Sequence, residues 1–313
     1  MTLAAYIRRR LFLMIPIALG VTLVTFLLIH LIPGDPAVTL LGIRASPALV
    51  ARLHREWGLD QPLYAQYANF LLRVLRGDFG TSLFYGTSAT SVIVAASGVT
   101  LWLIAYSAIL SIVIAVPLAL LAATHRDGIT DHGVRAIPLI GMGMPTPWVG
   151  IMLILLLGLT VPIFPVGGYG SGVGGHMYAL FLPSLTLALG IVPILIRSLR
   201  TSLIDSFESD YVTTARSKGI RERRVLMRHG FRNAIISSVT ILGLEIAWLI
   251  SGTIVVEKVF ALPGIGALMV DSIYRRDFPV VQGITFVVAI LVILTNLATD
   301  IVHSLLDARV RFE

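Results

Sequence analysis

The residues best suited to chemistry are ionisable side chains within long apolar stretches. Glu245 lies inside the apolar segment 234–256, Asp300 near the end of another apolar stretch, and His30 near the end of the first. A carboxylate among apolar groups costs free energy unless it meets water or a partner. Glu245 therefore either lines a polar path or binds a cationic group, or it is paired or protonated against Asn296 or a backbone group. Asp300 and His30 fit interfacial positions better than catalytic ones.

Motifs for nucleotides, metals and nucleophiles are missing or misplaced. Segment 170–175 matches G-x-G-x-x-G, but a dinucleotide site needs a preceding soluble strand and a following helix N-terminus. The two lysines, Lys218 and Lys258, do not follow glycine, so the chain has no G-x-x-x-x-G-K-[ST] phosphate loop. Cysteine and H-E-x-x-H are absent, and the histidines are too scattered to propose metal ligands. We expect no catalytic residue, metal or cofactor here; ATP-driven work must come from another chain.

Segment 198–233 is polar, basic and patterned. Apolar residues repeat every four positions and predict one helical stripe ending before Gly219, formed by Leu203, Phe207, Tyr211 and Ala215. A second short helix is expected from Ile220 to His229, with Val225 and His229 on one face and basic residues around them. A helix–glycine–helix with apolar anchors and a basic rim suits docking into a groove of a soluble partner. Attachment to anionic lipid headgroups is the alternative.

The elements that must position these residues are long apolar helices. The chain has 313 residues, 56% of them apolar and 13% charged, whereas soluble proteins carry roughly 25% charged residues. A water-soluble enzyme is thus disfavoured. A membrane span needs about 20 apolar residues. The pattern predicts an all-α polytopic membrane protein with six transmembrane helices, the first within 1–32 and the others at about 92–123, 136–160, 177–197, 234–256 and 282–303.

The basic residues predict the orientation. Cytoplasmic loops keep an excess of Lys and Arg, and with both termini inside the cytoplasmic pieces hold 16 of the 24 Lys and Arg residues. The short outer loops then hold only Lys258, Arg275 and Arg276. We therefore expect both termini in the cytoplasm. The net charge of +7 reflects this asymmetry, and a nucleic-acid partner is not expected.

Residues 33–91 form an outer segment between the first two spans. Ser-Pro at 46–47 predicts a helix start, and Gly58 predicts its end. A second amphipathic helix is expected over 62–77. We expect these helices to lie on the outer membrane face or on a partner, as a cap over the bundle, and residues 92–313 to form the core.

Two spans have features of their own. The second carries a small-residue stripe that allows close helix approach: Ser107, Ser111, Ala115 and Ala119. The third should break near its middle, because it contains Gly141, Gly143, Pro145 and Pro147. Discontinuous helices in transporters often border the substrate site, so Pro145, Trp148 and Glu245 are candidates for a translocation path. A simple packing kink is the alternative.

Several motifs carry a resemblance to a known family. Segments 210–220, 222–225 and 229–234 resemble the cytoplasmic EAA loop of bacterial ABC-importer permeases, in the version of the dipeptide/oligopeptide/nickel permease family. Four more segments are similar to that family's first permease subunit: 32–36, 58–62, 77–82 and 256–266. Thr213, Thr214 and Ala215 stand where the family has Glu-Ala-Ala, and Gly219 stands at its glycine. The acidic first position and the closing Leu-Pro are absent, and tail residues 307–309 have Ala where the family has Pro.

This resemblance implies a type I ABC importer permease fold, with an extracytoplasmic helical insert after the first helix, in a bacterial inner membrane. The implied partners are a second homologous permease, two cytosolic ABC ATPases that hold ATP and Mg²⁺, an extracytoplasmic substrate-binding protein and membrane lipid. Di- or oligopeptides are the leading cargo, and nickel complexes, glutathione or haem are the rivals. This chain would form half of the translocation path.

The resemblance also implies coupling to the ATPases through loop 198–233. The expected coupling residues are Tyr211, Thr213, Thr214, Ala215, Gly219, Arg224, Val225, Arg228 and His229. Arg224 and Arg228 are expected at the polar rim, and Tyr211 and Ala215 to fix the helix against the bundle. A self-sufficient channel or proton-coupled carrier, with Glu245 or Asp300 relaying charge, is the competing class. A membrane enzyme is disfavoured for want of a nucleophile–base pair or metal set.

Overall fold

The computed structural model describes residues 3–31, 35, 37–38, 45–82, 84–221, 224–225, 227 and 231–306. Within this part of the chain the regular structure is helical, apart from an isolated β-bridge between Thr81 and Ser88. The first part of the chain holds α1 Leu3–Leu31, α3 Pro47–Trp57 and α4 Leu63–Leu75. The remaining helices are α5 Ala89–Thr124, α6 Ile129–Gly141, α7 Thr146–Leu153, the π-helix η2 Ile154–Thr160, α8 Gly172–Ala179, α9 Phe181–Phe207, α10 Asp210–Ser217, α12 Arg232–Val259, α13 Ile265–Tyr274 and α14 Phe278–Leu306.

The two helices predicted within residues 33–91 are confirmed, and α3 has the predicted caps. The Ser46 side chain accepts a hydrogen bond from the backbone N–H of Leu49 at 3.3 Å, and proline occupies the first position of α3. Gly58 ends α3 in the left-handed conformation, with φ of 68°. Helix α4 begins directly after Pro62 and packs Phe70 and Val74 against α1. The cap residues predicted from the sequence thus set both ends of α3.

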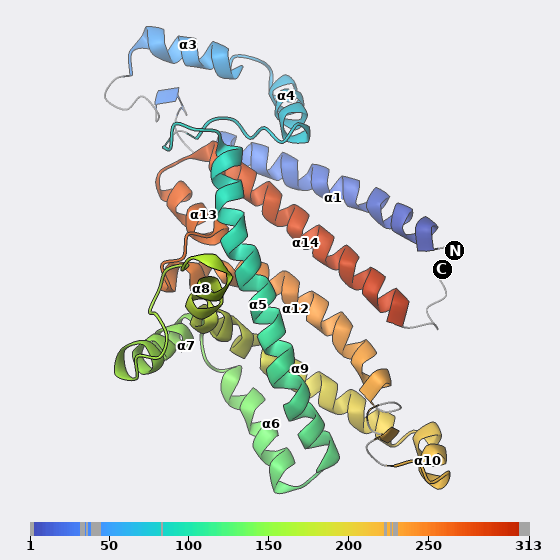
Figure 1. Ribbon diagram of the computed structural model, residues 1–313. Helices are drawn as coiled ribbons and strands as arrows, with labels where there is room; N and C mark the ends of the chain where they lie inside the picture. Colours follow the sequence, from blue (N-terminus) through green and yellow to red (C-terminus); the bar gives the residue numbers. More distant parts are fainter. Residues whose placement is uncertain are drawn as a thin grey trace.

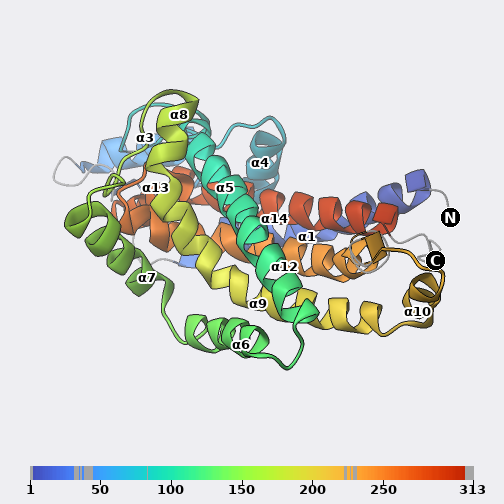
Figure 2. The same ribbon diagram turned by 60° about the horizontal axis from the view of Figure 1, so that its bottom comes forward.

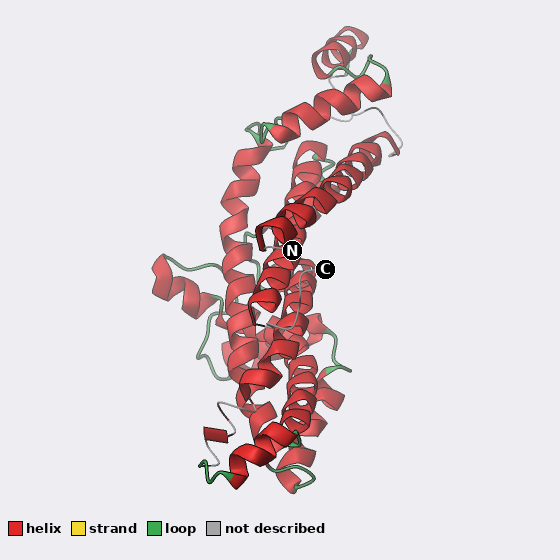
Figure 3. Ribbon diagram, turned by 90° about the vertical axis from the view of Figure 1, so that its right-hand side faces the viewer, coloured by secondary structure: helices red, strands yellow, loops and turns green. Residues whose placement is uncertain are grey.

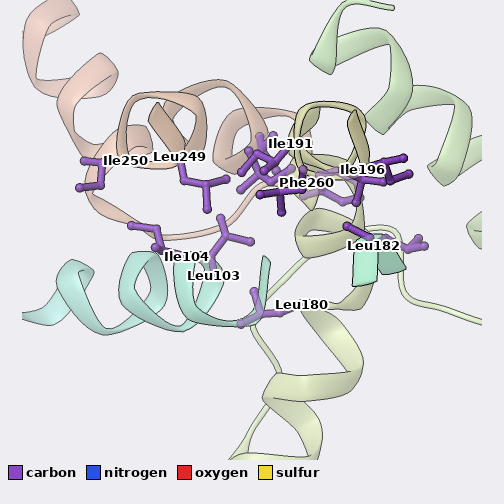
Figure 4. Packing of buried hydrophobic residues seen from close by; sticks show 14 of the residues in the cluster. Leu103, Ile104, Leu180, Leu182, Ile191, Ile196, Leu249, Ile250 and Phe260 are labelled. Atoms are coloured by element: carbon purple, nitrogen blue, oxygen red, sulfur yellow. The ribbon is translucent and has the colours of Figure 1, made fainter. Parts of the chain in front are cut away.

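The core lies between α5, α9 and α12, with α14 packed on α12 and α1 on the outside of α14 (Figure 1). Leu103 of α5, Ile191 of α9 and Leu249 of α12 turn toward one another in this core (Figure 4). The small residues Ser107 and Ser111 are fully buried, and α5 has its most extensive packing against α9. The predicted small-residue stripe is therefore a close-packing face.

The predicted break of the third span is confirmed. Helix α6 ends at Gly141, and α7 begins at Thr146, after four intervening residues, and passes into the π-helix η2. A Cβ at Gly141 would lie 3.0 Å from the ring of Pro193, and one at Gly150 would lie 3.3 Å from Thr186. Both neighbours belong to α9. The glycines on each side of the break thus let α6 and α7 lie directly on α9.

Three of the described helices are long and apolar enough to cross a membrane: Ala89–Thr124, Phe181–Phe207 and Phe278–Val302. Two shorter apolar stretches, Phe12–Leu27 and Thr146–Thr160, fall on the expected first and third spans, and the fifth, in α12, is not among the three. Helix α9 overlaps the expected fourth span, 177–197, and continues ten residues beyond it. Helix α13 was not predicted, since its ten residues are shorter than any membrane span.

The bundle has two distinct ends. The start of α1, the end of α14 and α10 lie on one side, and α3, α7 and α13 lie toward the other (Figure 2). Helices α3 and α4 extend beyond the bundle, at the top of Figure 1 and of the view in Figure 3. We call the end with α10 the inner end and the end with α13 the outer end.

Candidate functional site

The loop expected to couple to a partner begins with a change of helix direction. Helix α9 ends at Phe207 and α10 starts at Asp210, so the prediction of one continuous helical stripe is wrong. Ser209 between them is extended, with φ of −71° and ψ of 149°. Its carbonyl accepts hydrogen bonds from the backbone N–H groups of Val212 and Thr213, which starts a new helix at an angle.

Helix α10 packs on the following turn through a small apolar cluster. Val212, Ala215 and Val225 are buried together, with Ile220 partly buried against them. Tyr211 is 42% exposed, and Val212 rather than Tyr211 belongs to this cluster. The break at Ser209 explains the change, because it resets the helical phase by which Tyr211 would have followed Phe207.

Gly219 reverses the chain after α10. Its φ of +74° lies in the left-handed region that favours glycine. The N–H of Ile220 then donates to the carbonyl of Ala215, and the N–H groups of Arg224 and Val225 donate to the carbonyl of Arg221. The Arg224 side chain is exposed, as expected for a rim residue. Arg228 and His229 lie outside the described residues.

Thr213 and Thr214, at the positions of the family's Glu-Ala-Ala, are exposed on α10. The Thr214 hydroxyl donates to the carbonyl of Asp210 at 2.8 Å, one turn earlier in the same helix. These side chains therefore present a mostly polar surface away from the apolar cluster. Together with Arg224, they form the accessible face of this loop.

Ion pairs fasten the turn between α5 and α6 to α9 near the loop. Asp131 is fully buried and accepts two hydrogen bonds from the Arg200 guanidinium, at 2.6 and 2.5 Å, and one from the N–H of Asp127 at 3.0 Å. The bond from Arg200 is the main cause that lowers the pKa of Asp131 to about 2, against the opposing effect of burial. Arg126 also pairs with Glu208, directly before α10. Sequence reasoning missed both pairs, which join residues 69 and 82 positions apart.

A buried carboxylate organises the outer end. Glu257, near the end of α12, is fully buried and accepts hydrogen bonds from the Thr100 hydroxyl at 2.6 Å and from the N–H of Ala267 at 2.9 Å. The Thr100 hydroxyl oxygen in turn accepts the N–H of Ile265 at 2.8 Å. The pair thus satisfies the first turn of α13 and joins it to α5 and α12. The only sequence signal was the position of Glu257 within the similar segment 256–266.

The residues proposed for a translocation path lie on two elements. Pro145 precedes the first residue of α7, and Trp148 in the first turn of α7 is 46% exposed. Glu245 is half-buried on α12, one helical turn before the exposed Trp248. The Trp248 ring lies 3.5 Å from the position of a Cβ at Gly190, on α9. Helix α7 also packs on α9 and α12, and a Cβ at Gly150 of α7 would lie 3.2 Å from Phe260, at the end of α12.

Pairing of Glu245 with Asn296, one of the alternatives given above, is not found among the described residues. Gly243 faces Thr299 of α14 closely enough that a Cβ there would overlap it. Two residues further along a helix the direction has turned by about 200°, so Glu245 points away from α14. Within the described part of the chain, no group of three His, Asp or Glu residues is arranged to hold a metal ion.

Comparison with known proteins identifies the family. Residues 115–312 match the family model described as binding-protein-dependent transport system inner membrane component, and residues 3–88 match the model of the N-terminal part of such membrane components. The chain is similar to the oligopeptide transport system permease protein AppB of Bacillus subtilis, with 37% identity over 99% of this chain and 100% of that protein. It is also 35% identical to the glutathione transport system permease protein GsiC of Salmonella choleraesuis, over 98% and 99% of the two chains.

A solved structure supports the fold. The crystal structure of an amino acid ABC transporter with histidines superposes with a TM-score of 0.51, over 71% of this chain and 95% of that chain, at 14% identity. At this identity the likeness concerns the fold alone. The matches to the family model and to the permeases cover nearly the whole sequence. The chain therefore belongs to the family of inner membrane components of binding-protein-dependent transport systems.

Proposed function

We propose that this chain is one of two related permease subunits of an ATP-driven importer for di- or oligopeptides. The names of the similar permeases support a peptide cargo, since two classes among them are described as oligopeptide and glutathione systems. Its partners are a second homologous permease, two cytosolic ATPases that bind ATP and Mg²⁺, and an extracytoplasmic binding protein. The absence of a phosphate loop in the sequence supports assigning ATP hydrolysis to the partner chains.

The proposed topology has six spans, with both termini and loop 198–233 in the cytoplasm and residues 33–91 outside. Two observations support it: the start of α1, the end of α14 and α10 lie on the same side of the bundle (Figure 2), and the expected inner loops hold an excess of basic residues. In this topology the inner end of the bundle faces the ATPases. The outer end, with α3 and α13, faces the binding protein.

One observation supports the proposal that α10 and the following turn couple the permease to the ATPases. Val212, Ala215 and Val225 of this loop are buried against one another, while Arg224 and the threonines of α10 are exposed, as are Tyr211 and Met227. The cluster thus joins α10 to Val225 and leaves polar, basic and some apolar side chains for a partner to contact. ATP can drive transport through this contact only if the ATPases bind more tightly to one state of the permease.

The ion pair of Asp131 and Arg200 offers a route by which a displacement of α10 reaches the membrane-embedded helices. It joins α9, which leads into α10, to the start of α6, whose other end is the break before α7. A displacement of α10 would therefore reach Pro145 and Trp148 through two rigid helices. Glu245 and Trp248 lie on α12, which packs on α7, and these four residues are our proposed lining of the path.

The test is purification of the chain from its native membrane in mild detergent, with identification of accompanying proteins and an ATPase assay. We expect a second permease and ATPases, with hydrolysis stimulated by a binding protein. Gly219→Pro, and the double change of Arg224 and Arg228 to Glu, should each lower ATP-driven peptide uptake at least tenfold. The matched control reverses the same number of charges at the inner end: Arg8 and Arg9 to Glu. Uptake at the wild-type rate in the loop variants would contradict the coupling assignment.

A self-sufficient carrier is the second candidate, favoured by the half-buried Glu245, which has no hydrogen bond or ion pair among the described residues. Such a carrier would move solute in liposomes made from the purified chain alone, without ATP. Glu245→Gln would then abolish transport. Transport that requires the complete complex and ATP would exclude this candidate.

A further inference from the structure

Two tight turns at the outer end are held together by one buried carboxylate. Asp277, between α13 and α14, is fully buried. It accepts hydrogen bonds from the Ser82 hydroxyl at 2.5 Å and from the N–H of Phe84 at 3.2 Å. The Ser82 oxygen in turn accepts the N–H of Tyr85 at 3.0 Å. The turn before α5 is thereby fixed to the turn between α13 and α14, although they are almost 200 residues apart in sequence.

The backbone of Asp277 is also held by hydrogen bonds. The N–H of Asp277 donates to the carbonyl of Ser272 at 2.8 Å, and its carbonyl accepts the N–H of Val281 in the first turn of α14 at 3.1 Å. Arg276 adopts a φ of 56°, an uncommon conformation for a residue with a side chain. Such conformations persist only where surrounding structure enforces them and often occur at functional sites. The two turns therefore form one rigid unit.

This unit exposes large side chains that a soluble surface rarely leaves uncovered. Tyr274 is 85% exposed, Phe84 and Ile273 are each 53% exposed, and Tyr85 is 44% exposed. Phe84 and Tyr85 pack edge to face with ring centroids 5.0 Å apart. The guanidinium of Arg275 lies over the Phe84 ring, 3.5 Å from its centroid. We call this surface the outer patch; its members are Phe84, Tyr85, Ile273, Tyr274, Arg275 and Arg276.

The outer patch is basic. Arg275 and Arg276 are exposed, and the nearest carboxylate in sequence, Asp277, is buried and turned toward Ser82 and Phe84. Asp271, one helical turn earlier on α13, is paired with Lys258 at 2.5 Å. A partner that covers this surface would therefore need carboxylates at the rim and an apolar recess for the rings.

We propose that the outer patch is a docking site for the extracytoplasmic binding protein, with Tyr274 entering an apolar recess that is rimmed by carboxylates. This inference rests on the proposed function, which supplies the partner and the side on which it arrives. Tyr and Arg dominate the binding energy of protein interfaces, where they fill central pockets. A rigid surface also loses little conformational entropy on binding. Both features occur together in the outer patch, at the end of the bundle away from α10 (Figure 1).

Anionic lipid is the competing occupant, because Tyr and Arg also gather at membrane interfaces. Anionic lipid and the binding protein require different properties of the outer patch. A lipid surface attracts any nearby basic residue, whereas a folded partner requires the shape held by Asp277. The test therefore varies the patch, the rest of the outer surface and the lipid separately.

The experiment uses the complete transporter in liposomes of phosphatidylcholine, with or without anionic lipid, and measures ATPase activity against binding-protein concentration. We expect Tyr274→Ala, and the double change of Arg275 and Arg276 to Glu, to raise the half-maximal concentration at least tenfold. The rate at saturating binding protein should change by less than twofold, a split that general destabilisation would not produce. Matched controls at the same end are Tyr64→Ala and the double change of Arg73 and Arg76 to Glu, all exposed residues of the α4 region. These should keep the wild-type half-maximal concentration.

Three results would overturn the proposal. Patch variants with the wild-type half-maximal concentration would show that the binding protein docks elsewhere. An effect that disappears in vesicles without anionic lipid would assign the patch to lipid. A wild-type complex that no binding protein stimulates would overturn the proposed function itself, and the patch assignment with it. A photo-crosslinking residue at Tyr274 that joins the binding protein, but not one at Tyr64, would support the patch independently of the kinetics.

Discussion

The two ends of the bundle use their buried carboxylates in different ways. At the inner end, Asp131 pairs with the charged Arg200 side chain of another helix. At the outer end, Glu257 and Asp277 are satisfied by hydroxyl groups and backbone N–H groups, with no basic side chain among the bonds described above. An ion pair joins two side chains that can separate and re-form on rigid helices. A carboxylate bound to backbone N–H groups fixes the path of the chain itself.

This difference suggests a division of labour. The outer end is expected to keep one shape, because moving Glu257 would leave N–H groups in the first turn of α13 buried without acceptors. The inner end can change its geometry at the lower cost of exchanging one charged contact for another. We therefore expect changes at the outer end to lower stability, and changes at the inner end to lower the coupling between ATP hydrolysis and transport.

The largest effect is expected for Glu257→Ala. The substitution leaves the Thr100 hydroxyl and the N–H of Ala267 buried without their acceptor and opens a cavity, at a cost of about 4 kcal/mol in the free energy of unfolding. Thermal unfolding of the purified complex measures it. Glu245→Ala, on the same helix without described hydrogen bonds, is the matched control and should cost less. Equal unfolding midpoints for the two variants would show that the Glu257 network does not stabilise the outer end.

Arg200→Met is the corresponding test at the inner end. It leaves Asp131 buried without its charged partner, which costs about 3 kcal/mol when the carboxylate stays ionised. The more specific expectation is functional: ATP hydrolysed per peptide imported should rise severalfold, because α9 no longer moves α6. Exchanging the two charges, with Asp131→Arg and Arg200→Asp, should restore part of the coupling. A ratio that stays at the wild-type value in Arg200→Met would remove the ion pair from the transmission route.

The pH dependence of this ion pair has a defined sign. The pKa of Asp131 is lowered from 3.8 to about 2, mainly by the hydrogen bond from Arg200, so the folded state binds this proton less readily than the unfolded state. The resulting stability, about 2 kcal/mol, is fully present above pH 4 and is lost as the pH falls through 2. Unfolding midpoints measured from pH 8 to pH 2 should therefore differ between wild type and Asp131→Asn by a constant amount above pH 4, and converge below it. Convergence already between pH 6 and pH 5 would contradict this assignment.

The sequence predicted elements better than it predicted contacts. The cap at Ser46, the glycine turns at 58 and 219 and the broken third span are local signals, because each depends on a few neighbouring residues. The two helices of the outer segment were therefore found with nearly correct bounds. The end of α9 was missed because its last residues are amphipathic rather than apolar, and hydropathy alone does not show where such a helix stops.

The candidate site was predictable only in part, for the same reason. The apolar pattern of loop 198–233 located α10, but the turn at Ser209 rotated the buried face from Tyr211 to Val212. The carboxylates at 131, 257 and 277 gave no local signal of their roles, because their partners lie on other helices. An isolated charge next to an apolar helix indicates that a partner is needed. The identity of that partner can be read only from the folded structure.

The smallest effect is expected for the exposed ion pair at the inner end, which can be compared directly with the buried one. Arg126 and Glu208 form an ion pair beside that of Asp131 and Arg200, but both side chains are about half exposed or more, so solvent screens their attraction. Arg126→Ala should lower the free energy of unfolding by less than about 0.5 kcal/mol and leave the ratio of ATP hydrolysed to peptide imported within twofold of wild type. The measurements are those used for Arg200→Met, at 20 mM and 500 mM salt as a further check, since any effect of an exposed pair should shrink with salt. A loss of coupling as large as that of Arg200→Met would mean that the turn before α6 transmits force through its surface, and not through the buried Asp131.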